Sequence, residues 1–304
     1  MKRAPANDPH IAQIMAQLPP HREGLAAAQR YRLPFGRQSW RGYQGAWQGA
    51  GTGSSIDFQD HRAYMPGDDP RYIHWAAYAR TGQLTMKLYR AEVSPMVDVV
   101  VDVSASMTFD TIKAARMEAL TVFCVASADR AGAPVRVHAV CGREVRAVPV
   151  ESVRAGGESG WRGRLENLES KTQVPGHLPW RAGALKVLVC DLLFPGDPSS
   201  LLSEMSAGGG AAVVFAPALA SEAAPQERGN VELIDCESGV HRHQRIDEAL
   251  AERYHQAYTR HFELWGEAAR RCGVTLVRVP CEGALTDVLG GDPLTSGAVE
   301  ICAR

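Results

Sequence analysis

The chain has 304 residues, of which 45% are hydrophobic and 22% are charged. These proportions are typical of a globular protein, and a chain of this length buries a substantial core without disulfides. A disulfide-rich miniprotein, a collagen, a coiled coil and a wholly disordered chain are therefore excluded. The 33 basic and 34 acidic residues leave a net charge of −1, so no overall field draws the protein toward nucleic acid or anionic lipid.

Cysteine usage and hydropathy both indicate a cytoplasmic protein. The chain has seven cysteines, an odd number, without a CxxC pair, and several lie in apolar runs. This usage is typical of buried, reduced thiols. No apolar run approaches the roughly 18 residues of a membrane-spanning helix. The first 20 residues also lack the continuous apolar region of a secretory signal. We therefore expect no transmembrane segment.

The N-terminal region differs in composition from the rest. Residues 1–50 contain seven basic and two acidic residues, with tyrosines and tryptophans among the arginines. This mixture also occurs in platforms that bind single-stranded nucleic acid. Because the other motifs point elsewhere, we expect residues 1–48 to be a basic and aromatic arm that packs on the domain or on a partner, and we do not expect a nucleic-acid ligand. Contact of this arm with a membrane surface stays open.

Further along, short apolar runs alternate with helical patterns. Buried strands are predicted at Val97–Val103, Leu185–Cys190, Ala211–Ala216 and Val274–Val279, and a shorter one at Val231–Ile234. A hairpin is predicted from Val135–Val140 and Glu144–Val148. Helices are predicted over residues 109–130, 164–169, 198–206, 247–271 and 285–289.

This alternation predicts an α/β fold. Parallel strands that are apolar throughout need helices on both faces of their sheet. We expect a mostly parallel sheet in a main domain over residues 95–304, with one antiparallel strand at an edge. Residues 49–94 form a separate preceding segment, which begins with the turn-rich connector Gly49–Ser55. In such sheets ligands bind beyond the carboxyl ends of the strands.

The first predicted strand ends in a D-x-S-x-S pattern. Asp102, Ser104 and Ser106 follow the apolar run, and the alternating spacing turns one carboxylate and two hydroxyls to one side. Hard oxygen ligands of this kind suit Mg²⁺. Asp191 follows a second apolar run, so in a parallel sheet it reaches the same edge. The pattern predicts a magnesium site formed by these four residues.

Two simpler interpretations accompany this prediction. Ser106 or Thr108 is also suited to cap the following helix, since serine and threonine are common caps. Cys190 precedes Asp191, and strand alternation would place its side chain on the opposite side as a buried thiol.

The D-x-S-x-S pattern, followed by a strand-end aspartate, resembles the metal-ion-dependent adhesion site of von Willebrand factor A domains. A second stretch narrows the resemblance to a bacterial family, domain-of-unknown-function family fifty-eight. Its members have von Willebrand factor A-like domains and are often encoded beside MoxR-type AAA+ ATPases. The matching residues are Asp57-Phe58, Arg62, Tyr64, Pro66–Trp75, Ala79-Arg80, Leu84, Lys87 and Glu92. Residues 231–235, Glu237, Gly239, Tyr254 and His261 match its C-terminal half.

The chain departs from these patterns at two positions. The family often has aspartate before the tryptophan, where this chain has His74. Full adhesion sites also use a threonine from a separate loop. Ser159 and Thr172 were considered for this role, and neither has a convincing setting. A site without that ligand would be weak unless a partner supplies another oxygen.

The signature segment has two interpretations. In the first, Asp68, Asp69, Arg71, His74 and Trp75 form a partner-binding surface. In the second, which we favour, the segment is structural: Pro66–Asp68 makes a turn, Arg62 and Arg71 pair with the acids, and Trp75 packs on the main domain.

The resemblance implies an interaction protein rather than an enzyme. Its expected partners are a MoxR-type AAA+ ATPase and an unidentified client, with a chaperone-like role in complex assembly or maturation. Two alternatives stay open: a metal-free scaffold on the same fold, and a Mg²⁺-dependent hydrolase that uses the same residues. The sequence places no general base, so the hydrolase is the less favoured alternative.

Overall fold

The computed structural model describes residues 19–37, 47–52, 58–93, 95–156, 161 and 177–302. The helix predicted over residues 164–169 lies outside these ranges, and so do Ser159 and Thr172. Among the described residues, no helix combines the length and the apolar character that crossing a bilayer requires.

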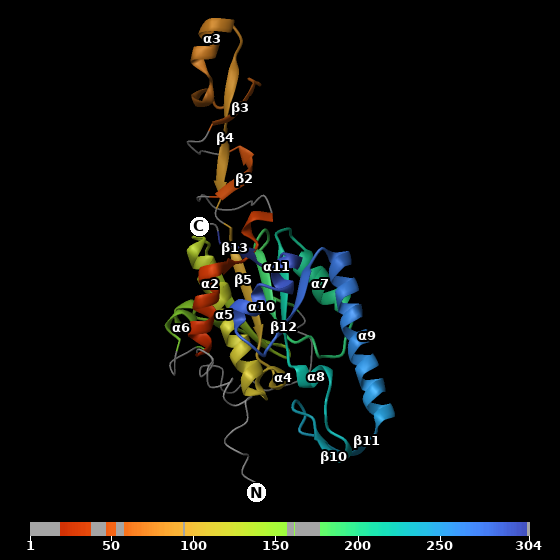
Figure 1. The fold of residues 1–304 in the computed structure, drawn as a ribbon. Helices are drawn as coiled ribbons and strands as arrows, with labels where there is room; N and C mark the ends of the chain where they lie inside the picture. Colours follow the sequence, from red (N-terminus) through yellow and green to blue (C-terminus); the bar gives the residue numbers. More distant parts are fainter. Residues whose placement is uncertain are drawn as a thin grey trace.

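A six-stranded sheet forms the centre of the main domain (Figure 1). Its strands are adjacent in the order β12-β9-β8-β5-β6-β7, and all neighbours are parallel except the β6–β7 hairpin at one edge. The predicted α/β fold with one antiparallel edge strand is therefore confirmed. The strands are β5 (Val97–Asp102), β6 (Val135–Cys141), β7 (Glu144–Val148), β8 (Leu185–Val189), β9 (Ala212–Ala218) and β12 (Thr275–Pro280).

Helices cover both faces of this sheet. Successive residues of the central strands enter opposite cores, so Val99 and Val101 belong to one buried cluster and Val100 to the other. This is why these strands are apolar throughout. The first core is covered by α2 (Pro20–Arg30), α5 (Thr111–Arg130), α6 (Val150–Ala155) and α10 (Leu285–Leu289), and the second by α7 (Pro198–Ser206) and α9 (Glu248–Cys272). The short helices are α4 (Ala105–Thr108), α8 (Ala220–Ala223) and α11 (Asp292–Ser296).

Residues 19–37 of the expected N-terminal arm are an integral part of the main domain. Helix α2 packs against α5, and β1 (Tyr31–Arg32) pairs with β13 (Glu300–Ile301) near the end of the chain. Leu33 and Phe35 are fully buried in the first core, the latter in the short 3-10 helix η1 (Phe35–Arg37). Residues 19–37 thus contribute to folding of the main domain, and the expected boundary at residue 48 does not separate them from it.

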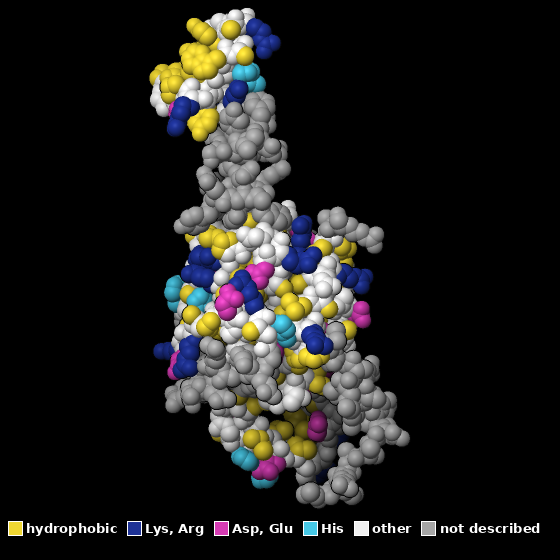
Figure 2. Space-filling model, turned by 90° about the vertical axis from the view of Figure 1, so that its left-hand side faces the viewer, with side chains coloured by type: hydrophobic (Ala, Val, Ile, Leu, Met, Phe, Trp, Pro, Cys, Tyr) yellow, Lys and Arg dark blue, Asp and Glu magenta, His cyan; other side chains and the backbone are white. Residues whose placement is uncertain are grey.

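Residues 47–52 and 58–93 project from the main domain (Figure 1). The sheet of this projection is formed by three antiparallel strands, in the order β2 (Trp47–Thr52), β4 (Thr85–Val93) and β3 (Phe58–Ala63). The 3-10 helix η2 (Pro70–Tyr72) and helix α3 (Trp75–Thr81) lie at its far end. The prediction that Trp75 packs on the main domain is wrong, because its side chain is 59% exposed at this far end. Figure 2 shows hydrophobic side chains gathered there, where Met65 and Tyr78 are also exposed.

A second projection is the hairpin of β10 (Gly229–Ile234) and β11 (His241–Ile246). The sequence predicted the first strand but not the second, because the polar run His241–Arg245 gives no apolar alternation. Figure 1 shows the hairpin beside α4 and α8, beyond the carboxyl ends of β5 and β8.

The contact between α2 and α5 gives a direct test of this packing. A Cβ atom added at Gly24 would lie 2.5 Å from the backbone oxygen of Ala119 on α5. Gly24→Ala should therefore destabilise the protein by about 1 to 3 kcal/mol, although alanine favours helices. Gly266→Ala in α9 is the matched control, because the nearest atom to its Cβ would be the end of Arg270 at 3.7 Å. Urea unfolding should rank Gly266→Ala at or above the wild type and Gly24→Ala below it. The reverse order would contradict the packing.

Candidate metal site at the carboxyl ends of the strands

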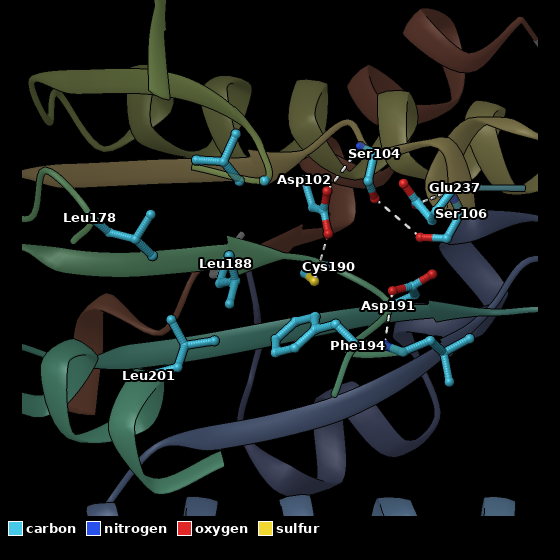
Figure 3. A pocket seen from close by; sticks show the side chains of 13 residues that line it. Asp102, Ser104, Ser106, Leu178, Leu188, Cys190, Asp191, Phe194, Leu201 and Glu237 are labelled. Atoms are coloured by element: carbon cyan, nitrogen blue, oxygen red, sulfur yellow. Dashed lines mark hydrogen bonds between the residues drawn. The ribbon is translucent and has the colours of Figure 1, made fainter. Parts of the chain in front are cut away.

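The D-x-S-x-S residues follow β5 directly and turn toward a small cavity. Asp102 is the last residue of β5, and its Oδ1 accepts a hydrogen bond of 2.9 Å from the backbone N–H of Ser104. This bond folds the chain back, so that the hydroxyls of Ser104 and Ser106 lie 3.1 Å apart (Figure 3). Asp102 and Ser104 are buried. The predicted placement of one carboxylate and two hydroxyls on one side is therefore correct.

The capping interpretation does not account for these serines. Helix α5 begins after Asp110, whose Oδ1 accepts hydrogen bonds from the backbone N–H groups of Ile112 and Lys113. Thr108 uses its hydroxyl to donate to the backbone oxygen of Ser104. Ser104 occupies the N-cap position of the four-residue helix α4 without a capping hydrogen bond from its side chain. The hydroxyls of Ser104 and Ser106 are therefore directed to the cavity.

Cys190 and Asp191 both reach the cavity, and the prediction that Cys190 lies on the opposite side is wrong. Strand β8 ends at Val189, so strand alternation no longer applies beyond it. Leu192 then has a φ of 62°, a strained conformation for a branched residue, and its buried side chain holds the turn in place. The Sγ of Cys190 donates to Oδ2 of Asp102 at 3.0 Å. Ligand atoms of Asp102, Cys190 and Asp191 lie within 4.8 Å of one another.

A buried lysine, which sequence reasoning missed, neutralises part of this charge. Lys113 of α5 is inaccessible to solvent, and its Nζ lies 2.7 Å from Oδ2 of Asp191 and 2.5 Å from Oε1 of Glu222 in α8. Burial alone would lower the pKa of Lys113, but the two carboxylates raise it above its usual value. Lys113 is therefore charged. Oδ1 of Asp191 accepts a hydrogen bond from the backbone N–H of Leu193.

Negative charge at the site still exceeds positive charge. Burial, together with repulsion from Asp191, raises the pKa of Asp102 to about 6. Burial also raises the pKa of the Cys190 thiol well above its usual value, so this residue carries a proton that it donates to Asp102. At neutral pH the carboxylates of Asp102, Asp191 and Glu222 therefore lie near one lysine.

Glu237, at the tip of the β10–β11 hairpin, is a further acidic residue at the site. Its Oε1 accepts a hydrogen bond of 2.8 Å from the backbone N–H of Ser106. Figure 3 shows the Glu237 side chain beside Ser104 and Ser106. In the sequence, Glu237 stands out only as a match to the family, because 131 positions separate it from Ser106.

The cavity has a volume of about 30 Å³. Oxygen atoms lie at one end, where Asp102, Ser104, Ser106, Asp191 and Glu237 line it, and apolar side chains such as Leu188, Phe194 and Leu201 line the other. This volume holds an ion with a coordinated water, whereas sites for organic ligands are about ten times larger. The hydroxyl and carboxylate donors fit a hard divalent cation such as Mg²⁺.

The residues of the signature segment lie elsewhere. Asp68 pairs with Arg62 at 2.5 Å and Asp69 pairs with Arg71 at 2.6 Å, so the predicted ion pairs are present. Nδ1 of His74 shares a hydrogen bond of 2.8 Å with Nε2 of His61. Figure 1 shows this segment at the opposite end of the molecule from α4 and the β10–β11 hairpin. These residues therefore form no part of the metal site.

The raised pKa of Asp102 predicts a pH dependence of stability in metal-free buffer. An aspartate in the unfolded chain has a pKa of about 3.9, so the folded protein retains its proton to higher pH. The free energy of unfolding therefore falls between about pH 4 and pH 6 and stays lower above this range. Asp102→Asn cannot ionise, so its free energy of unfolding relative to that of the wild type should rise across this range by about 3 kcal/mol. Urea unfolding of both proteins at several pH values measures this difference, and a difference independent of pH would contradict it.

The chain is similar to several known proteins. Uncharacterized proteins of Mycobacterium tuberculosis and Mycobacterium bovis are 27% identical over 234 residues, which is 72% of this chain and 72% of theirs. The crystal structure of a conserved hypothetical protein, BatB from Bacteroides thetaiotaomicron, aligns with 65% of this chain and 98% of its own, at 12% identity and a TM-score of 0.33. The family model of the protein of unknown function DUF58 matches residues 60–263. Because this match spans more than half of the chain, the protein belongs to the DUF58 family.

Proposed function

We propose that this protein is a non-enzymatic interaction protein that binds Mg²⁺ at the carboxyl ends of β5 and β8 and uses the ion to dock an acidic side chain of a partner. The observation that carries this proposal is the convergence of Asp102, Ser104, Ser106 and Asp191 on one small cavity. Asp102 and Asp191, at two strand ends, are 89 positions apart in the sequence. With the two serines they bring oxygen donors to a cavity whose volume suits one ion.

The charge balance favours a divalent cation at this place. An ionised carboxylate in a buried position is costly unless it is paired, and Lys113 faces Asp191 and Glu222. A divalent cation next to Asp102 would offset the remaining negative charge. Cys190 is the one thiol among the residues that line the cavity and hydrogen-bonds Asp102, so oxygen atoms are the main donors. This set of donors favours Mg²⁺ over a thiolate-preferring ion such as Zn²⁺.

The size of the cavity supports docking over catalysis. An ion held by a few protein oxygens keeps coordination positions for water or for a carboxylate from outside. A cavity of about 30 Å³ leaves no room to bury an organic substrate beside the ion. The ion would supply positive charge to bind a partner's carboxylate. The class of the partner, a MoxR-type AAA+ ATPase acting with a client protein, comes from the family resemblance.

The two serines provide the test of docking. Ser104→Ala and Ser106→Ala remove the hydroxyl donors and leave both carboxylates in place. With Mg²⁺ present throughout, a MoxR-type ATPase from the same organism should be retained on the immobilised wild type. Its retention should fall at least tenfold on the double variant, because the ion is lost. Ser203→Ala on the exposed surface of α7 is the control and should retain the ATPase fully.

Thermal unfolding of each variant verifies that the fold is intact. Equal retention by the wild type and by the double variant would contradict metal-assisted docking and would favour a metal-free scaffold. Mg²⁺-dependent hydrolysis of phosphate esters that is lost in Asp191→Ala would instead favour an enzyme.

A further inference from the structure

We propose that Glu237 is a ligand of the same ion, carried on a hairpin that closes over the site when the ion binds. This inference rests on the proposed Mg²⁺ site and adds a moving part to it. The ligand that the D-x-S-x-S pattern lacks would then come from the β10–β11 hairpin rather than from a threonine.

The first support is the position of the Glu237 carboxylate. Its Oε1 lies 2.8 Å from the backbone nitrogen of Ser106, and the Ser106 hydroxyl lies 3.1 Å from the Ser104 hydroxyl. All three side chains line the same cavity. A carboxylate in this position is a suitable oxygen donor for a hard cation.

The second support is the turn that presents Glu237. Oδ1 of Asp235 accepts hydrogen bonds from the backbone N–H groups of Glu237 at 2.8 Å and Ser238 at 3.0 Å. Gly239, with a φ of 67°, closes the turn and donates its N–H to the backbone oxygen of Asp235 at 2.8 Å. The tip is therefore internally ordered, so that movement of the whole hairpin carries Glu237 with it.

The third support is the exposure of the rest of the hairpin. Apart from Val231 and Ile246, which are partly buried, the residues of β10 and β11 are exposed. Elements with few buried contacts open at low cost in free energy. Without an ion, the charge of Glu237 lies near those of Asp102 and Asp191 and favours opening; a bound cation reverses this balance.

Thermodynamic linkage makes the inference quantitative. If Glu237 strengthens Mg²⁺ binding by a given factor, Mg²⁺ must stabilise the closed hairpin relative to the open one by the same factor. Loss of even a residue that only orients a metal ligand commonly weakens binding by about 10- to 100-fold, so loss of a ligand costs about tenfold or more. We therefore expect Glu237 to contribute roughly tenfold to Mg²⁺ affinity. Saturating Mg²⁺ should lower the population of the open hairpin, and with it the rate of hydrogen exchange, by the same factor.

The inference also assigns a consequence to partner binding. Glu237 would hold the coordination position that an acidic side chain from a partner needs. A partner would then displace Glu237, and the hairpin would open as the partner docks. In this arrangement the chain protects its own ion until a partner arrives.

The test compares Glu237→Gln with Glu232→Gln. Glu232 lies on β10 of the same hairpin, where its carboxylate pairs with His241, so its substitution makes the same chemical change away from the cavity. Calorimetric titration with Mg²⁺ measures affinity, and hydrogen exchange over residues 229–246 with and without saturating Mg²⁺ measures opening. Glu237→Gln should bind Mg²⁺ about tenfold more weakly and lose the slowing of exchange. Glu232→Gln should match the wild type in both.

Three outcomes would overturn the inference, and they separate it from the proposed function. If the wild type binds Mg²⁺ and Glu237→Gln binds it equally well, Glu237 is not a ligand, while the Mg²⁺ site stands. If affinity falls but Mg²⁺ does not slow exchange in the wild-type hairpin, Glu237 acts without hairpin closure. If the wild type does not bind Mg²⁺, the proposed function fails and this inference fails with it.

Discussion

Buried negative charge at the carboxyl ends of β5 and β8 is the constraint on which the other features of this protein depend. Asp102 ends β5 and Asp191 follows β8, and both strands are buried on both faces, so water solvates the two carboxylates poorly. The fold compensates in part with Lys113, which donates to Asp191 and Glu222, and with the Cys190 thiol and the Ser104 N–H, which donate to Asp102. A bound cation is proposed to offset the negative charge that remains. The protein without metal then has a lower stability, and the site gains affinity for the ion.

Elements from distant parts of the chain contact one another through the acidic residues at this site. Lys113 connects α5 to the end of β8 and to α8, and Glu237 connects the β10–β11 hairpin to α4. A change in charge at one point therefore affects several elements together, and this would be the physical basis of the proposed coupling between an ion, the hairpin and a partner. The signature segment lies at the other end of the molecule, where its exposed Trp75 and Tyr78 are available for separate contacts.

The fold was largely predictable because its signals are local. Apolar runs and helical periodicity identified the six strands of the main sheet, and Gly273 caps the end of α9 as capping rules require. The cap at the start of α5 is Asp110, whereas the sequence had offered Ser106 or Thr108. The predicted strands also located Asp102, Ser104, Ser106 and Asp191, because polar residues at the end of a buried apolar run lie at the carboxyl edge of the sheet. Cys190 was misplaced because alternation was extended beyond the end of the strand. Lys113 and Glu237 act through contacts across 78 and 131 positions, which no local pattern encodes. Lys113 shares α5 with Arg116 and Glu118, so its place in the helix did not distinguish it.

The most direct test of the account is a count of bound ions. Mn²⁺, which also prefers oxygen ligands, can be titrated into the metal-free protein and its free concentration followed by electron paramagnetic resonance. The account predicts one bound Mn²⁺ per chain, released by excess Mg²⁺ and absent from Asp102→Ala. No saturable binding by the wild type, or equal binding by Asp102→Ala, would contradict the presence of a cation site at the carboxyl ends of β5 and β8.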